Sequence, residues 1–357
     1  MEQINASSAY SKGWTGKGSI IVVADSGYDI DHTEFSGQII ATKDYTGTGI
    51  NDNHGHGTHV LGTIIAKKDN SGMHGVAFDS KLVGANVDYS GNGRISKSKA
   101  QVALHDFAKL KDPNGENLNI VAVNMSFNTP SLFKNSANDY LPTTVVKLND
   151  GTFNATEITL RVNHNDGQAK YYKVATDNDI ILVNSAGNSE FEFASDPGIW
   201  ATEVDASGNL ILGGKMVIVG NWDTTGQIVQ GNKAGHVCLD INTSNNTCND
   251  KHRISDFYIL APGQEIYSAV ADNGYMNMSG TSMAAPHVTG AFGILNEMWP
   301  HMKGENLVQL VLTTANKDIK EYDVNTHGHG LLDLDEATKP QGVVGIPTTG
   351  RTNGPVV

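Results

Sequence analysis

The sequence has only two cysteines, Cys238 and Cys248, among 357 residues. This scarcity excludes a disulfide-dense scaffold, and a chain of this length buries enough apolar surface to fold without one. Both cysteines stand in a polar segment rich in Asn and Thr, where His236 and His252 are the nearest other metal-binding side chains. A zinc site and a disulfide therefore both stay open. We favour a disulfide that closes a surface loop, which predicts an oxidising compartment.

Basic residues and long apolar runs are also scarce. Lys and Arg number 25 against 38 Asp and Glu, the net charge is −13, and no basic block occurs. We therefore expect no nucleic-acid partner, because phosphate binding needs a basic surface. No stretch approaches the roughly 18 apolar residues of a membrane span. The first ten residues lack the basic and apolar regions of a signal peptide, so we expect a mature or trimmed chain.

Short apolar segments alternate with helical patterns along the chain. Segment 19–24 reads Ser-Ile-Ile-Val-Val-Ala, which is typical of a strand buried on both faces. Similar expected strands are 82–87, 119–123, 180–183, 216–219 and 257–260. Helical patterns occur at 58–68, 96–110, 282–298 and 306–314. This alternation predicts an α/β fold with a parallel sheet covered by helices on both faces.

Two polar stretches interrupt the alternation and are expected to be insertions. Segment 128–179 contains two Asp-Gly pairs between alternating apolar and polar residues, which predicts β-hairpins. Segment 221–255 contains the two cysteines. We therefore expect a single domain over residues 1–338 that contains both insertions. A Gly-, Pro- and Thr-rich tail or linker over 339–357 follows it.

Two residues with catalytic side chains stand at the ends of expected elements. Asp25 directly follows the strand 19–24, at the sheet edge where open α/β folds bind ligands, although such an Asp is also a common turn residue. His56 lies between two glycines at the start of an expected helix. His59 follows three residues later, but no Glu follows His56, and the common zinc proteases space the pair by four. We therefore do not predict a metal at these histidines.

A serine stands at the start of the expected helix 282–298. The hydroxyl of Ser282 could simply cap the helix, but free N–H groups there also stabilise an oxyanion beside a nucleophile. Pro286 is expected in the first helical turn, where its missing N–H costs little. The chain order Asp, His, Ser is one of the orders known for a single triad geometry. The fold would have to bring the three residues together.

These segments resemble the three catalytic blocks of the subtilisin family. They read Asp-Ser-Gly at 25–27, His-Gly-Thr-His-Val at 56–60 and Gly-Thr-Ser-Met-Ala-Ala-Pro-His-Val at 280–288. Ser-Ala-Gly-Asn at 185–188 is similar to the family's oxyanion block. The resemblance covers roughly residues 9–337 outside the insertions. It implies the family's three-layer α/β fold with a mainly parallel central sheet flanked by helices, here with a β-hairpin-rich insertion.

The resemblance also implies residue roles. Ser282 would be the nucleophile, His56 the general base, and Asp25 the carboxylate that orients the imidazole. Asn188 and the Ser282 backbone N–H would bind the oxyanion of a secreted serine endopeptidase. A transpeptidase or peptide ligase on the same fold stays open, and so does an inactive binding protein.

By resemblance, an extended substrate would lie between segments 90–95 and 126–128. The implied pocket residues are Ser90, Gly91, Gly93, Ser126, Phe127, Asn128, Ser185, Ala186, Gly187 and Ser195. The family usually has small residues and glycines where this chain has Phe127 and Asn128. We expect medium-sized apolar residues before the cleaved bond.

Further expectations concern metals, partners and location. The chemistry requires no cofactor, but Glu34 and Asp69 would supply carboxylates to a structural Ca²⁺ site at the loop after the His56 helix. A lysine-flanked turn without metal stays open there. We expect a polypeptide substrate, a monomer, and, by resemblance, an inhibitory pro-segment in the precursor. The expected location is extracellular or at the cell surface, reached through a periplasm if the chain is an autotransporter-type passenger.

Overall fold

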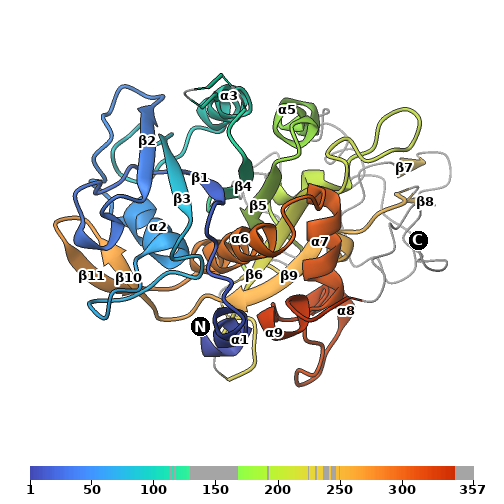
Figure 1. The fold of residues 1–357 in the computed structure, drawn as a ribbon. Coiled ribbons are helices and arrows are strands. Elements are labelled where there is room, and N and C mark those ends of the chain that lie inside the picture. Colours follow the sequence, from blue (N-terminus) through green and yellow to red (C-terminus); the bar gives the residue numbers. More distant parts are fainter. Residues whose placement is uncertain are drawn as a thin grey trace.

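The computed structural model of the protein describes residues 1–112, 114–115, 117–128, 168–190, 193–223, 225–229, 231–235, 241–242, 247–248 and 250–341. Most of the helices and strands belong to one α/β unit (Figure 1). The strands are β1 Ile20–Asp25, β2 Ile39–Asp44, β3 Lys81–Asn86, β4 Ile120–Met125, β5 Ile181–Ser185, β6 Met216–Trp222, β7 Ile241–Asn242, β8 Thr247–Cys248, β9 Tyr258–Pro262, β10 Ile266–Val270 and β11 Gly274–Met278. The α-helices are α1 Ala6–Ser11, α2 His56–Ile65, α3 Lys97–Phe107, α5 Lys173–Asp177, α6 Thr281–Met298, α7 Gly304–Thr313, α8 Val324–His327 and α9 Leu334–Ala337. The 3-10 helices are η1 Glu2–Ile4, η2 Thr33–Phe35, η4 Gln168–Tyr171, η5 Gly198–Thr202 and η6 Ile254–Phe257.

Seven strands form a parallel sheet in the order β2-β3-β1-β4-β5-β6-β9. All six strands expected from the sequence are present in it. Strands β2 and β3 lie on one side of β1, and β4, β5, β6 and β9 lie on the other. Successive strands are therefore added on one side of β1 up to β3 and on the other side from β4 onward. Open α/β sheets bind ligands at the point where the direction of strand addition reverses, which here lies between β1 and β4.

Helices cover both faces of the sheet. Successive side chains of β1 point to opposite faces. Ile21 and Val23 join the core under α2, α6 and α7, whereas Val22 and Ala24 join the core under α3 and α5. The predicted three-layer α/β fold is thus confirmed.

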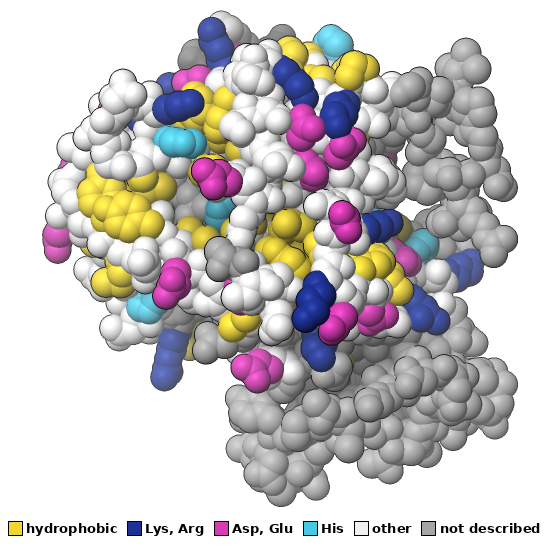
Figure 2. All heavy atoms as spheres, turned by 90° about the horizontal axis from the view of Figure 1, so that it is seen from below, with side chains coloured by type: hydrophobic (Ala, Val, Ile, Leu, Met, Phe, Trp, Pro, Cys, Tyr) yellow, Lys and Arg dark blue, Asp and Glu magenta, His cyan; other side chains and the backbone are white. Residues whose placement is uncertain are grey.

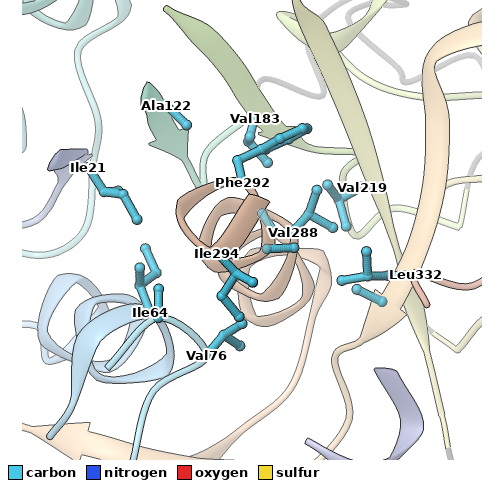
Figure 3. Packing of buried hydrophobic residues seen from close by; sticks show 14 of the residues in the cluster. Ile21, Ile64, Val76, Ala122, Val183, Val219, Val288, Phe292, Ile294 and Leu332 are labelled. Carbon is cyan, nitrogen blue, oxygen red and sulfur yellow. The ribbon is translucent and has the colours of Figure 1, made fainter. Parts of the chain in front are cut away.

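The long helix α6 lies at the centre of the first core. Val288 and Phe292 pack toward Val183 and Val219 of the sheet, and Ile294 lies on the side of α2 (Figure 3). The buried side chains of α6 extend from Thr281 to Asn296. This packing holds the first turn of α6, which carries Ser282, in a fixed place relative to the sheet.

The two expected insertions fall largely outside the described residues. The hairpins predicted within 128–179 would lie at 129–167, which the structure does not describe. The end of that interval is helical instead, because η4 and α5 form there and α5 packs against α3 and β5. In the second interval, β7 and β8 pair as a short antiparallel hairpin. Cys238 and the side chain of Cys248 lie outside the described residues, so the disulfide stays a prediction. The tail is described only to residue 341.

Surface features complete the description. Among the described residues, no helix combines the length and apolarity needed to cross a bilayer. Figure 2 shows one face of the molecule, on which Lys and Arg side chains are interspersed with Asp and Glu. The antiparallel pair β10–β11, which was not expected from the sequence, lies beside α2 and leads directly into α6.

Candidate active site

The carboxyl edge of the sheet brings together residues that are far apart in the sequence. β1 ends at Asp25, and Ser126 follows the end of β4. Helix α2 begins with His56, and Ser282 is the second residue of α6. Asp25, His56, Ser126 and Ser282 all line one cavity of about 230 Å³. The sheet order places this cavity at the reversal between β1 and β4.

Asp25 and His56 form a direct hydrogen bond. His56 Nδ1 lies 2.7 Å from Asp25 Oδ1, which also accepts the backbone N–H of Ser26 at 2.8 Å. Asp25 is 1% exposed, whereas the His56 side chain is 20% exposed. Burial alone would lower the pKa of His56, but the charges of Asp25 and Asp52 outweigh it and raise the pKa above its ordinary value. Since Nδ1 is engaged by the carboxylate, Nε2 is the nitrogen left for proton transfer.

Asp52, which sequence reasoning did not select, fixes the start of α2. Its buried carboxylate accepts hydrogen bonds from Ser26 Oγ, from the N–H groups of His54, Gly55 and Thr58, and from Thr58 Oγ1. These contacts tie the end of β1 to the first turn of α2. A carboxylate there also complements the positive end of the helix dipole. The N-cap position itself is Gly55, and Asp52 stands six residues before the expected helix, so no local start signal selected it.

Ser282 lies in the first turn of α6 and is 8% exposed. Its Oγ donates to the backbone carbonyl of Ser126 at 3.1 Å, and no hydrogen bond joins it to His56. Such catalytic contacts often tighten only when substrate binds. The Ser282 N–H precedes the first intrahelical hydrogen bonds, so it is one of the N–H groups that a helix cannot satisfy itself.

Pro286 lies inside α6 and not in its first turn, which corrects the expectation from the sequence. A proline in a helix interior removes the hydrogen bond to the carbonyl four residues earlier, here that of Ser282. Ser126 Oγ donates to this carbonyl at 2.8 Å and replaces the lost bond. Ser126 and Ser282 are therefore joined in both directions, which ties β4 to the start of α6.

Asn188 faces the same cavity from the loop after β5. Its Oδ1 accepts the backbone N–H of Thr281 at 2.8 Å and Thr281 Oγ1 at 2.9 Å. A backbone N–H can only donate, so the oxygen of the amide must face Thr281. The Nδ2 group, with two hydrogen-bond donors, is consequently left for the cavity side.

The substrate residues expected from the sequence divide into two groups. Gly93, Ser126, Phe127 and Asn128 line the cavity, together with His54, Ile95 and Lys97. Ser90 and Gly91 do not line it, because segment 88–95 folds back as a tight turn. There the Asp88 carboxylate accepts from the N–H groups of Ser90 and Gly93.

Ser185, Ala186, Gly187 and Ser195 are buried behind the cavity lining. Asn128 Nδ2 donates to Ser185 Oγ at 3.3 Å. Ser195 N–H donates to the carbonyl of Ala186 at 2.7 Å, and Asn232 Nδ2 donates to Ser195 Oγ. A side chain on Gly187 would collide with Asn232 and Ser195. These four residues support the wall formed by Asn128 and Asn188.

The two carboxylates expected for calcium both lie at the loop after α2, where they accept hydrogen bonds from protein donors. Glu34 Oε1 accepts from the Tyr275 hydroxyl at 2.6 Å and from the Met73 N–H at 3.0 Å. Asp69 Oδ1 accepts from the Ser71 N–H in its own turn. Within the described part of the chain, no three His, Cys, Asp or Glu side chains converge as metal ligands. The calcium site stays a prediction to which the described geometry adds no further ligand.

His59 does not face the cavity. It is fully buried, and its Nε2 lies 2.8 Å from the Ile266 carbonyl and 3.2 Å from the Met276 carbonyl. It therefore connects α2 to both strands of the β10–β11 hairpin. Burial lowers the pKa of His59 to about 4, so the ring is neutral near pH 7.

Comparison with known proteins gives the family. The chain is 27% identical to an extracellular serine protease of Serratia marcescens over 94% of this chain and 33% of that protein. It is 25% identical to the major intracellular serine protease of Bacillus subtilis, covering 93% of this chain and 86% of that protein. It is 23% identical to subtilisin DY of Bacillus licheniformis, covering 94% and 96%. The chain thus spans about a third of the Serratia relatives. The model of the subtilase family matches residues 16–331, and the chain belongs to the subtilase family.

Proposed function

We propose that the chain is a serine endopeptidase in which Ser282, His56 and Asp25 act as nucleophile, base and orienting carboxylate. The observation that carries the proposal is the 2.7 Å hydrogen bond between His56 and the buried Asp25, in a cavity that Ser282 also lines. Family membership supports hydrolysis of peptide bonds, since the relatives named above are serine proteases.

The proposed reaction uses each of these groups in turn. Ser282 Oγ would rotate away from the Ser126 carbonyl toward His56 Nε2. As Oγ bonds to the scissile carbonyl carbon, its proton passes to His56, and Asp25 stabilises the imidazolium. His56 then gives the proton to the leaving amine as the C–N bond breaks. Water repeats the two proton transfers and releases the acid, which restores Ser282.

The oxyanion would be bound by two donors at the start of α6. Asn188 Nδ2 is directed by the Thr281 contacts, and the Ser282 N–H has no intrahelical partner. Both are in place before substrate arrives, which is how such donors lower the barrier. A secreted location is supported by the extracellular Serratia relatives, although the Bacillus subtilis relative is intracellular.

Labelling with a fluorophosphonate probe tests the proposal. The wild type should gain one probe per chain, mapped to Ser282, and Ser282→Ala should gain none. Ser279→Ala is the matched control, because its hydroxyl lies three residues away and accepts from the Glu265 N–H. Mass spectrometry of a peptide library should show hydrolytic fragments. Labelling at another residue, or products joined to amines in place of hydrolysis, would contradict the endopeptidase.

A further inference from the structure

Lys97 brings a positive charge to the cavity that contains His56 and Ser282. It is the first residue of α3 and lines that cavity, and its side chain is 32% exposed. Ser96 caps the helix by accepting the Lys99 N–H, and Ile95 forms a bridge with Asp88. The backbone at Lys97 is therefore fixed on both sides. Because the backbone at Lys97 is fixed, its ammonium group can reach only a limited region.

The ammonium group of Lys97 is held by Asp196. Lys97 Nζ lies 2.6 Å from Asp196 Oδ2 and 5.7 Å from the ring centroid of Trp200. The Asp196 side chain is 5% exposed. The Lys97 side chain is the more exposed partner of this pair, and of the two residues it is the one that lines the cavity. An ammonium group has three N–H donors, and only one of them is used by Asp196.

Lys97 is the one Lys or Arg among the described residues that line the cavity. Asp25 is the acid among them, but it is 1% exposed and bonded to His56. Asp196, which pairs with Lys97, is buried and does not line the cavity. The partly exposed charged side chain at this lining is therefore the cation Lys97, in a protein whose net charge is −13. Charge of this sign at a recognition site favours anionic ligands.

We propose that Lys97 is a specificity-determining residue that selects polypeptides with an Asp or Glu side chain at the position that lies against the start of α3. This inference rests on the proposed function and names a substrate class for the same site. The carboxylate would accept a charge-assisted hydrogen bond from a free donor of Lys97. The sequence-based expectation of an apolar residue before the cleaved bond concerns a different substrate position.

The proposal is tested with pairs of peptide substrates that differ only in having Glu or Gln at one position. Each position of the peptide is changed in turn. For the wild type we expect kcat/KM to favour Glu about tenfold at one position, the size of one hydrogen bond to a charged group. The preference should shrink as salt is added. At all other positions the Glu/Gln ratio should stay near one.

Three variants separate selection from a structural role. Asp196→Asn leaves Lys97 uncompensated, so the Glu/Gln ratio should rise. Lys97→Met alone would remove the ammonium partner of the buried Asp196 carboxylate, a change that destabilises the fold. The double variant Lys97→Met with Asp196→Asn removes both charges, and its ratio should fall to about one. Lys99→Met removes the same charge from an exposed site on α3 outside the cavity, and its ratio should match the wild type.

The outcomes distinguish this inference from the proposed function. If the wild type cleaves the peptides with Glu/Gln ratios near one throughout, Lys97 does not select acids and the peptidase assignment stands. An acid preference that persists in the double variant also overturns the role of Lys97. If the wild type cleaves no peptide and takes no fluorophosphonate, the proposed function itself is wrong.

Discussion

Replacing Asp52 by Asn should weaken the junction between β1 and α2. The Asp52 carboxylate is 4% exposed and accepts five hydrogen bonds, two of them from Thr58 and two from the N–H groups of His54 and Gly55. Asn keeps one acceptor oxygen, but an NH₂ group that cannot accept a hydrogen bond replaces the second carboxylate oxygen. Either the two Thr58 donors, which bond to one carboxylate oxygen, or the donors that bond to the other oxygen then lose their charged acceptor.

The structure gives the size of this effect. Each hydrogen bond to a charged group contributes about 1.5–3 kcal/mol, so the loss of two predicts a decrease of about 3–6 kcal/mol in unfolding free energy. At about 2 °C per kcal/mol for a large domain, Tm should fall by about 6–12 °C. The pKa of His56 should fall as well, because the Asp52 charge helps to raise it. A base must be neutral to accept a proton, so the acid limb of kcat/KM should move to lower pH.

Thermal melts and a pH profile of kcat/KM check both effects. Asp318→Asn is the matched control, because Asp318 is exposed and bonds to Asn316 through its backbone N–H, not through its carboxylate. That control should stay within about 0.5 kcal/mol of the wild type. Equal Tm values for Asp52→Asn and the control, or an acid limb that moves upward, would refute the reasoning.

Three further predictions concern the site and its support. Asn188→Ala should lower kcat by about 10²–10³ with little change in KM, the value known for subtilisin's own oxyanion asparagine; an unchanged kcat would remove Asn188 from the reaction. Ser126→Ala leaves the Ser282 carbonyl without its donor, so urea unfolding should show a loss of about 1–3 kcal/mol, and none if another group replaces it. The pKa of His59 is lowered to about 4 in the folded protein. Its contribution to stability is therefore complete above about pH 6.5 and declines toward pH 4, by roughly 3 kcal/mol, because the unfolded chain binds the proton first. Urea unfolding between these pH values should show a shallower decline in His59→Gln, and an equal slope would count against this assignment.

The sequence predicted the parts of the fold whose signal is local. β1 and β4 are short apolar runs buried on both faces, and such runs are visible without tertiary information. The helix expected over 58–68 is present as α2, but it runs from His56 to Ile65 and so begins two residues and ends three residues earlier. The α/β alternation predicted the three layers. The approach of Asp25 to His56 came from motif order and family resemblance, since spacing alone cannot give a distance.

Features that depend on tertiary contacts were not predicted. The β10–β11 hairpin has mainly exposed or half-buried side chains in its second strand, so it lacks a clear apolar pattern. The pair Lys97–Asp196 joins residues that are remote in the sequence, and no local rule links them. Pro286 was misplaced because the hydroxyl of Ser126, which compensates for its missing N–H, comes from the residue after β4, far away in the sequence.

Double-mutant kinetics tests most directly whether Ser282 and His56 act as one unit. We would measure kcat/KM for Ser282→Ala, His56→Ala and the variant carrying both changes, on one peptide substrate. If Ser282 and His56 share a single proton transfer, the double variant should be about as slow as either single variant, as is known for subtilisin. Losses that multiply in the double variant, or hydrolysis that survives Ser282→Ala unchanged, would contradict the account.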